Sequence, residues 1–208
     1  SIKNRILSNF KYSIVNKDFI KITEDYIVKP RVENILLNFG LIDSKGLTLK
    51  ILELLKNFER YLKKINVNIA VGSSCQKIEQ IESITKSKKL NTKLFVDYNK
   101  MQNLILNSDI IIGAGGVGLI ERVCVGVPSI SILAAKNQSK QLIKLCRKKT
   151  TIKKELDTFE SENFFNSILN LISNFEIRLS LSKKCKTVVD GNGSYRVSKV
   201  IEDLFVQI

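Results

Sequence analysis

The residues best suited to chemistry lie in a glycine-rich stretch near the middle of the 208-residue chain, at residues 108–122 (SDIIIGAGGVGLIER). A short apolar run ends there in a turn with three glycines among four residues, and a helical pattern follows. Glycine lets the backbone come close to a ligand, and the first N–H groups of a helix attract phosphate. The pattern predicts a phosphate site, although a tight strand-to-helix turn without a ligand would have the same composition.

The same glycines fit the G-x-G-x-x-G pattern of dinucleotide-binding proteins at positions 113, 115 and 118. That pattern normally follows the first strand of its sheet, with an acidic residue about 20 residues later. Here it follows the fourth expected strand, and no acid stands at that distance. The nearby acid is Glu121, inside the helix, where its carboxylate could reach the ribose hydroxyls of a nucleotide. The alternative for Glu121 is a solvated residue paired with a basic neighbour.

The chain contains no histidine. This removes the commonest general base, the usual catalytic triads and most zinc sites. We therefore expect no catalytic residue, metal or cofactor in this chain, and any histidine base would lie in another part of the protein. The four cysteines, Cys75, Cys124, Cys146 and Cys185, lack C-x-x-C spacing, which favours buried free thiols in a reducing, cytoplasmic compartment.

The charge balance is strongly basic, with 34 Lys+Arg against 20 Asp+Glu and a net charge of +14. Of the basic residues 27 are lysine, and they are scattered without an arginine cluster or interleaved aromatic residues. We therefore expect no nucleic-acid partner, while a positive field remains compatible with a phosphorylated ligand. No apolar run approaches the roughly 18 residues of a membrane span, so none is expected.

Short apolar runs alternate with helical patterns from residue 33 onward, which predicts an α/β fold with a doubly wound, Rossmann-like parallel sheet. Strands are expected at 35–39, 67–71, 94–96, 110–112, 129–133 and, more weakly, 149–152. Helices are expected at 47–60, 75–86, 101–106, 117–125, 138–147 and in three stretches of the tail, 160–207.

Residues 1–30 do not continue this alternation, because their apolar residues come in short pairs and the segment ends at Pro30. We expect them to be the end of a preceding N-terminal domain and a linker. Residues 31–208 would then form the ligand-binding domain.

Several further motifs occur in a fixed order along the chain: KYSIVNKDF at 11–19, ILLNFGLID at 35–43, VGSS at 71–74, the segment 121–129, and VDGNG at 189–193. Together with the glycine turn, they resemble the C-terminal domain of the pseudaminic acid pathway UDP-sugar hydrolases, the UDP-2,4-diacetamido-2,4,6-trideoxy-altropyranose hydrolases. They are also similar to the spore coat polysaccharide biosynthesis glycosyltransferase-like proteins. The resemblance implies the C-terminal half of a glycosyltransferase-B-like two-domain fold that binds a UDP-sugar.

The resemblance also implies roles for individual residues near the glycine turn. Backbone N–H groups of Gly115, Gly116 and Val117 would bind the diphosphate, and Glu121 would hold the ribose hydroxyls. The family usually has a hydroxyl residue where this chain has Val117-Gly118, so contacts from hydroxyl groups to phosphate are lost.

Other implied contacts come from more distant segments. Phe95 and Val96 would border the uracil, although plain core packing explains them equally well. Gly40 would face the sugar, and its neighbour Leu41 replaces a family glycine and narrows that loop. The pair at 137–138, Asn137 and Gln138, would face the sugar or the phosphates, and it also fits a polar helix start.

The resemblance implies a UDP-sugar hydrolase in nonulosonic acid or surface polysaccharide biosynthesis, whose water is activated by a base in the missing N-terminal domain. A glycosyltransferase is the first alternative, because an acceptor can replace water. A non-catalytic nucleotide-sugar-binding domain is the second, favoured by Val117-Gly118 and the absent base. The chain alone is expected to be inactive.

Overall fold

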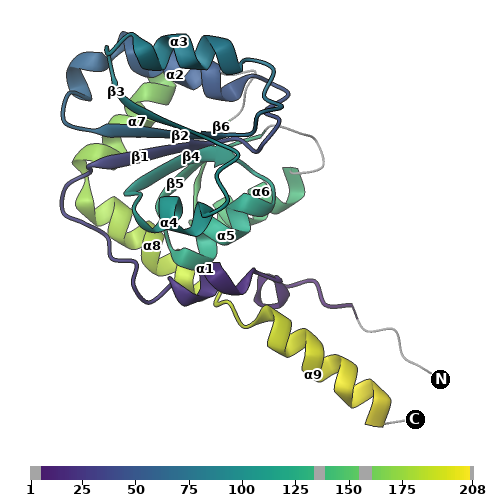
Figure 1. Ribbon diagram of the computed structural model, residues 1–208. Helices are drawn as coiled ribbons and strands as arrows, with labels where there is room; N and C mark the ends of the chain where they lie inside the picture. The colour runs from purple at the N-terminus through teal and green to yellow at the C-terminus, as the bar shows by residue number, and fades with distance from the viewer. Residues whose placement is uncertain (1–5, 134–138, 155–160, 207–208) are drawn as a thin grey trace.

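A computed structural model describes residues 6–133, 139–154 and 161–206 of the chain. These residues form a parallel sheet of six strands with helices on both faces (Figure 1). The strands are β1 (Asn34–Asn38), β2 (Asn66–Val71), β3 (Asn91–Val96), β4 (Ile110–Ala114), β5 (Ser129–Ile132) and β6 (Ile152–Lys154). Their order across the sheet, β3-β2-β1-β4-β5-β6, is that of a doubly wound, Rossmann-like sheet. The predicted fold class is therefore confirmed.

The helices divide between the two faces of the sheet. One face is covered by α2 (Leu47–Asn57), α3 (Ile78–Lys86) and α7 (Ser161–Ser173). The other is covered by α4 (Met101–Leu106), α5 (Val117–Val125), α6 (Ser139–Arg147) and the short α1 (Lys17–Lys21). Helix α8 (Phe175–Val188) contributes to both cores, and α9 (Gly193–Val206) follows it. Two 3-10 turns complete the elements, η1 (Phe10–Tyr12) and η2 (Glu59–Tyr61).

The centre of the sheet is fully buried because helices cover it on both sides. Leu37 of β1 lies in register with Ile69 of β2 and Ile112 of β4, and all three are 0% exposed. Successive side chains of a strand point to opposite faces. Accordingly Leu37 belongs to the core beneath α2, and Leu36 belongs to the core beneath α5.

The strand and helix bounds differ from the sequence expectations mainly at the sheet edges. Strand β3 begins at Asn91 rather than at residue 94, because an edge strand alternates polar and apolar residues. Strand β6 begins at Ile152 rather than at residue 149. Thr150 instead closes the end of α6, where its N–H and its hydroxyl both donate to the Leu145 carbonyl.

Polar groups close the edge of the sheet where the strands begin. The Asp109 carboxylate accepts the N–H groups of Glu33 and Asn34 at 2.8 and 2.9 Å. A row of asparagine side chains crosses the same edge, with Asn66 donating to Asn34 and Asn91 donating to Asn66. The entry into β1 is thereby fixed by side chains as well as by strand pairing.

Arg178 of α8 lies fully buried near the same edge. Its guanidinium donates four hydrogen bonds of 2.6–3.0 Å to carbonyl oxygens, those of Leu171, Ile172, Lys29 and Pro30. One arginine therefore ties the end of α7 to the chain that enters β1.

The segment before β1 packs on the sheet domain. Val15, Phe19 and Tyr26 are buried in the same core as the residues of α5. Burial raises the pKa of the Tyr26 phenol, whose hydroxyl has no hydrogen-bond partner within the described residues. Residues 15–26 thus share an apolar core with the domain that follows them.

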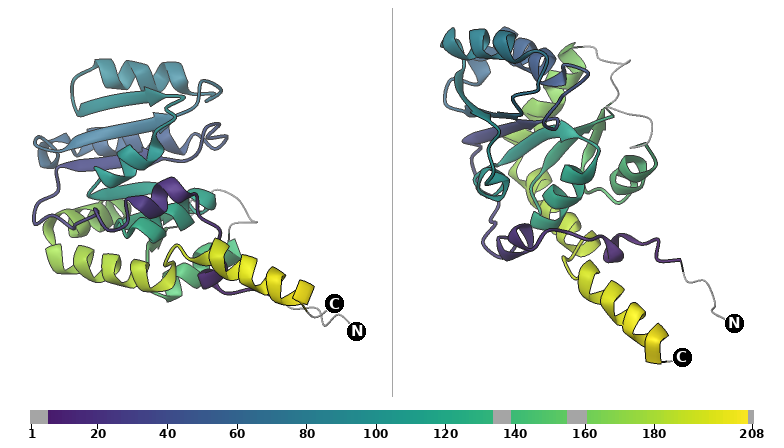
Figure 2. Two further views of the ribbon diagram at one scale, coloured as in Figure 1. Left: turned by 60° about the horizontal axis from the view of Figure 1, so that its bottom comes forward. Right: turned by 45° about the vertical axis from the view of Figure 1, so that its right-hand side comes forward.

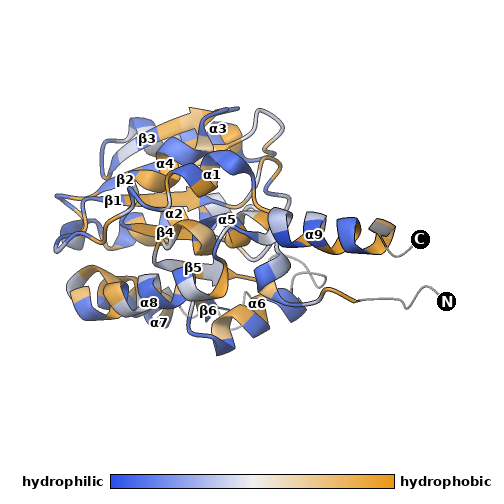
Figure 3. Cartoon of the chain, turned by 90° about the horizontal axis from the view of Figure 1, so that it is seen from below, coloured by the Kyte–Doolittle hydropathy of each residue, from blue (hydrophilic) through white to orange (hydrophobic). Residues whose placement is uncertain are grey.

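Helix α9 projects away from the sheet beside the start of the described chain (Figure 2). It alternates hydrophilic and hydrophobic residues along its length (Figure 3). The first turn of α9 is held to η1, because Arg196 donates a hydrogen bond of 2.8 Å to the Lys11 carbonyl. Gly193 lies so close to the Ser13 carbonyl that a β-carbon would overlap it.

Candidate functional site

The chain reverses its direction of travel across the sheet between β1 and β4. From β1 the chain leaves through α2 on one face, whereas from β4 it leaves through α5 on the other face. The two connections diverge, so they open a crevice beyond the carboxyl ends of these strands. Open α/β sheets bind their ligands at this switch point.

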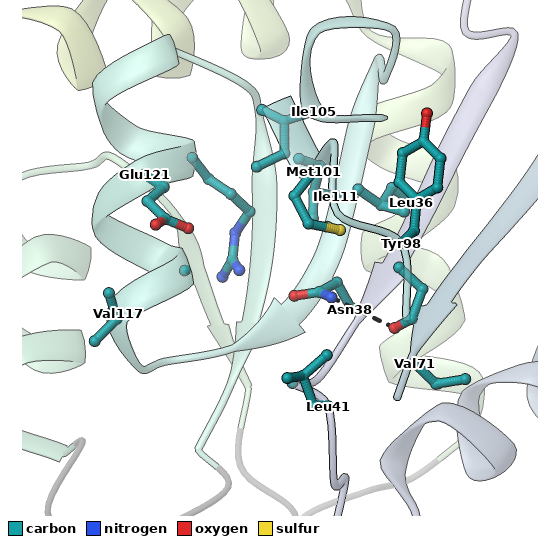
Figure 4. Close-up of a pocket in the computed structure, with 14 residues that line it drawn as sticks. Leu36, Asn38, Leu41, Val71, Tyr98, Met101, Ile105, Ile111, Val117 and Glu121 are labelled. Carbon is teal, nitrogen blue, oxygen red and sulfur yellow. Dashed lines mark hydrogen bonds between the residues drawn. The ribbon is translucent and has the colours of Figure 1, made fainter. Parts of the chain in front are cut away.

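A cavity of about 520 Å³ lies at this place, a size typical of small-molecule sites. Figure 4 shows its lining, which comes from the ends of β1 and β2 and from α4, β4 and α5. The lining residues are Leu36, Asn38, Gly40, Leu41, Ala70, Val71, Tyr98, Met101, Ile105, Ile111, Val117, Gly118, Glu121 and Arg122. The cavity therefore has an apolar wall on the α4 side and a polar wall on the α5 side.

The glycine turn joins β4 to α5 as the sequence predicts. The N–H of Gly115 already donates to the Ile132 carbonyl at 3.2 Å, so it continues the pairing of β4 with β5. The N–H groups of Gly116, Val117 and Gly118 have no backbone acceptor within the described residues. These three donors at the start of a nine-residue helix are the ones available to an anion.

Gly113 allows the close packing on which this corner depends. A β-carbon there would overlap the Asn38 carbonyl oxygen and lie 2.9 Å from Nη1 of Arg122. Any larger residue would push β4 from β1 or displace the arginine. The requirement for glycine at this position thus comes from the protein's own packing.

Glu121 stands one turn into α5 and lines the cavity. Burial raises the pKa of its carboxyl, and the neighbouring charge of Arg122 partly opposes that shift. No ion pair joins Glu121 to a cation within the described residues, although the charge of Arg122 acts on it, and its contact with ribose hydroxyls stays a prediction. A half-buried carboxylate without a partner is an acceptor suited to hydroxyl groups.

Arg122 also lines the cavity, although it was not among the predicted site residues. Its side chain is 2% exposed, and Nη2 donates to the Ala114 carbonyl at 2.8 Å and to the Ser131 hydroxyl at 3.3 Å. Burial lowers the pKa of its guanidinium to about 10, so the group stays charged at neutral pH. The only sequence signal was its position beside Glu121 on a helix next to the glycine turn.

The apolar wall differs in detail from the predicted uracil border. Phe95 packs edge-on against Tyr98, with ring centroids 5.1 Å apart, and it is Tyr98 that lines the cavity. Val96 is 40% exposed and lies in register with Val71, which also lines the cavity. Phe95 and Val96 therefore stay predictions, now as residues beside the wall.

The loop after β1 forms the mouth of the cavity. Gly40 has a φ of +97°, which favours glycine, and it lines the cavity together with Leu41. Leu41 is 65% exposed, and its carbonyl accepts the Gly72 N–H at 2.9 Å. Asn137 and Gln138, the other residues predicted to face the sugar, lie outside the described residues.

Among the described residues no cluster of three or more metal-ligating side chains occurs. Cys75, Cys124 and Cys185 are buried free thiols, and Cys146 is half-buried and also free. No helix within the described ranges is both long and apolar enough to cross a bilayer. What the site contains is a set of donors, one carboxylate, one guanidinium and an apolar wall.

Sequence comparison gives two relatives, while no family model matches the chain. The spore coat polysaccharide biosynthesis protein SpsG of Bacillus subtilis (strain 168) is 28% identical over 204 residues, covering 98% of this chain and 60% of SpsG. The uncharacterized protein MJ1062 of Methanocaldococcus jannaschii is 28% identical over 125 residues, 58% of this chain and 25% of that protein. The chain thus spans less than two thirds of either relative.

Structure comparison gives matches to parts of larger proteins. MurG of Acinetobacter baumannii matches with a TM-score of 0.71 and 16% identity over 98% of this chain and 57% of MurG. UDP-GlcNAc 2-epimerase of Neisseria meningitidis, solved with UDP-GlcNAc, matches with a TM-score of 0.57 and 19% identity over 92% of this chain and 48% of the epimerase.

A third structure matches almost over its full length. The C-terminal CMP-Kdo binding domain of WaaA from Acinetobacter baumannii has a TM-score of 0.57 and 12% identity over 84% of this chain and 99% of that domain. The chain is therefore homologous to SpsG and has the fold of glycosyltransferase-B domains such as that of MurG.

Proposed function

We propose that this chain is the UDP-sugar-binding domain of a hydrolase in nonulosonic (pseudaminic) acid or surface polysaccharide biosynthesis. The carrying observation is the polar wall of the cavity, where the N–H groups of residues 116–118, which have no acceptor among the described residues, lie one turn before the half-buried Glu121. This arrangement fits a diphosphate on the helix start and ribose hydroxyls on the carboxylate. Homology to SpsG and the likeness to an epimerase solved with UDP-GlcNAc support this ligand class.

In the proposed reaction, water attacks the anomeric carbon of the sugar, and the bond from that carbon to the diphosphate oxygen breaks. UDP leaves with the electron pair, and a base outside this chain takes the proton of the water. This domain would bind and orient the substrate and stabilise the negative charge on the departing diphosphate. Because the chain has no histidine, and because Glu121 is assigned to the ribose hydroxyls, we expect no turnover by the chain alone.

A glycosyltransferase is the second candidate, and its support is the likeness to WaaG, a glycosyltransferase involved in lipopolysaccharide biosynthesis, together with homology to SpsG. The same domain would serve both reactions, since an acceptor hydroxyl simply replaces water. A non-catalytic nucleotide-sugar-binding role is the third candidate. It rests on Val117, a 77% exposed apolar residue at the helix start where the resembling family has a hydroxyl residue.

Calorimetric titration of the 208-residue chain with UDP, UMP, NAD and a DNA duplex tests the proposal. We expect selective binding of UDP that weakens about tenfold in Glu121→Ala, since that variant removes hydrogen bonds to a charged acceptor. Absence of UDP binding at millimolar ligand, or tighter binding of NAD or duplex, would contradict it.

The hydrolase and the transferase are distinguished by an experiment in which this domain is joined to the proposed N-terminal domain. Incubation with a UDP-sugar in water, with and without candidate acceptors, then shows whether release of UDP needs an acceptor. Release in water alone supports the hydrolase, and acceptor-dependent release supports the transferase.

A further inference from the structure

Arg122 is a buried cation whose hydrogen bonding is incomplete. Its side chain is 2% exposed, yet no carboxylate pairs with it within the described residues. Nη2 makes both of its hydrogen bonds, Nε is buried without a partner, and Nη1 donates to no described group. Buried charges are normally paired because losing their hydration is costly.

The free end of this guanidinium lies at the polar wall of the cavity. Nη1 is 3.6 Å from the point that a β-carbon of Gly118 would occupy. The Glu121 carboxylate and the Asn38 amide oxygen lie 3.8 and 3.9 Å from the same point. The open space at Gly118 is therefore where the guanidinium, the carboxylate and the helix start converge.

The arginine is also held in place from behind. The Ser131 hydroxyl that accepts from Nη2 is 2.8 Å from the Thr151 hydroxyl, which the Ser129 hydroxyl contacts in turn at 3.0 Å. All three hydroxyl residues are buried. A cation anchored in this way across β5 and β6 keeps its orientation whether or not a ligand is present, which lowers the cost of binding.

We propose that Arg122 is an anion-binding residue of the cavity, with Nη1 donating to a phosphate oxygen of the ligand beside the N–H groups of residues 116–118. The inference rests on the proposed function for the identity of the nucleotide, but not for the presence of an anion. The anion site then comprises the N–H groups at the start of α5 and, next to them, the fixed positive charge of Arg122. Glu121 and Arg122, adjacent on one helix, then read hydroxyl groups and phosphate respectively.

The alternative is that Arg122 only ties β4 to β5. The two roles predict different ligand selectivity. An anion contact matters for UDP and inorganic pyrophosphate but not for uridine. A purely structural tie would change the affinities for uridine and UDP together, because it would act through the shape of the whole cavity.

The experiment titrates the 208-residue chain with UDP, uridine and pyrophosphate by NMR or calorimetry. The variants are Arg122→Met and Arg122→Lys, with Arg178→Lys as a control that alters an equally buried arginine far from the cavity. We expect Arg122→Met to weaken UDP and pyrophosphate on the order of 10- to 100-fold and uridine by less than about twofold. Arg122→Lys should lose less, because it keeps the charge and folds even if the methionine variant does not. Arg178→Lys should lower the melting temperature and leave the ratio of UDP to uridine affinity unchanged.

Unchanged UDP affinity in both Arg122 variants, or an equal loss for uridine and UDP, would overturn the role of Arg122 while leaving the proposed function intact. Binding of pyrophosphate that depends on Arg122, without any binding of UDP, would keep the anion site and overturn the nucleotide. Failure of the unaltered chain to bind either UDP or pyrophosphate would overturn both.

Discussion

Buried arginines lie on helices next to both ends of the strands of the central sheet. Arg178 is at the end where the strands begin (the amino edge), and Arg122 is at the end where they finish (the carboxyl edge). The two arginines have different surroundings. At the edge where the strands begin, Arg178 donates four hydrogen bonds to carbonyl oxygens, and Asp109 accepts two N–H groups nearby. At the edge where the strands end, Arg122 uses only Nη2, and Glu121 has no ion pair within the described residues.

The difference separates polar groups that stabilise the fold from polar groups that are left for a ligand. At the amino edge folding uses both Nη atoms of Arg178 and the Asp109 carboxylate, although Nε of Arg178 is buried without a partner among the described residues. The carboxyl edge holds a donor and an acceptor that no other described residue completes. Buried polar groups are normally paired, so an unpaired set beside a cavity marks the functional edge.

The largest expected effect concerns Arg178 and tests whether the polar groups of the amino edge stabilise the fold. Arg178→Met would leave four carbonyl oxygens near the amino edge without donors, so we expect the free energy of unfolding to fall by about 4 kcal/mol. Urea unfolding measures the loss. Arg60→Met is the control, because Arg60 is exposed and donates only to Tyr61. Equal stability of the two variants would mean that Arg178 does not tie α7 to the entry of β1.

The second prediction concerns Glu121 and tests whether the polar groups of the carboxyl edge serve a ligand. Glu121→Gln removes a half-buried charge, so the melting temperature should rise at neutral pH while affinity for a UDP-sugar falls about tenfold. Thermal unfolding and calorimetry give the two values. A variant that loses stability and affinity together would show that the carboxylate is part of the structural network instead.

The third prediction follows from the direction of the Glu121 pKa shift. Burial raises that pKa above 4.5, so the folded protein binds this proton more tightly than the unfolded chain does. The carboxylate therefore costs stability at neutral pH, and the cost disappears as the pH falls through the raised pKa. Affinity for a UDP-sugar, whose esterified diphosphate does not titrate in this range, should decline over the same interval.

Titrations from about pH 7.5 down to about pH 4.5 measure this decline, which should not exceed the loss in Glu121→Gln. In the glutamine variant the affinity should be flat over the same range. A decline of equal size in that variant would assign the titration to another group.

The smallest expected effect concerns Gly118. Its missing β-carbon would meet neighbours only at 3.6–3.9 Å, so a small side chain fits without strain. Gly118→Ser places a hydroxyl among Arg122, Glu121 and the helix start, and it should tighten UDP binding about threefold relative to Gly118→Ala. Calorimetry of the two variants isolates the hydroxyl, and equal affinities would show that the ligand phosphates lie elsewhere.

Much of the fold could be predicted from the sequence, because the buried strands are short apolar runs and the helices that cover them have dense apolar faces. Strand β4 and helix α5 were predicted within two residues at each end, because Gly113 lies near the end of β4 and Gly126 directly follows α5. Strand β6 was misplaced because Thr150 and Thr151 have high strand propensity, yet Thr150 is used to close α6.

The site was readable only in part. Glycines and a carboxylate next to an expected helix start indicate a phosphate and a ribose, but the position of Arg122 beside Glu121 does not by itself tell whether it binds a ligand or, like Arg178, holds the fold together. Their roles depend on which acceptors lie within 3 Å of each guanidinium, and those acceptors come from residues up to 149 positions away. Likewise Tyr98 and Asn38 line the cavity because of loop geometry that no local pattern encodes.

The clasp between η1 and α9 has a consequence for how the protein is made. The contact between Arg196 and Lys11 closes a loop of 185 residues, and Gly193 lies against the Ser13 carbonyl at the same place. Contacts this distant in sequence are slow to form, and a nascent chain emerges from its first residue onward. The clasp therefore cannot close until residue 196 has been synthesised, after every strand of the described sheet, whereas Phe10 can already pack on the core that contains α5.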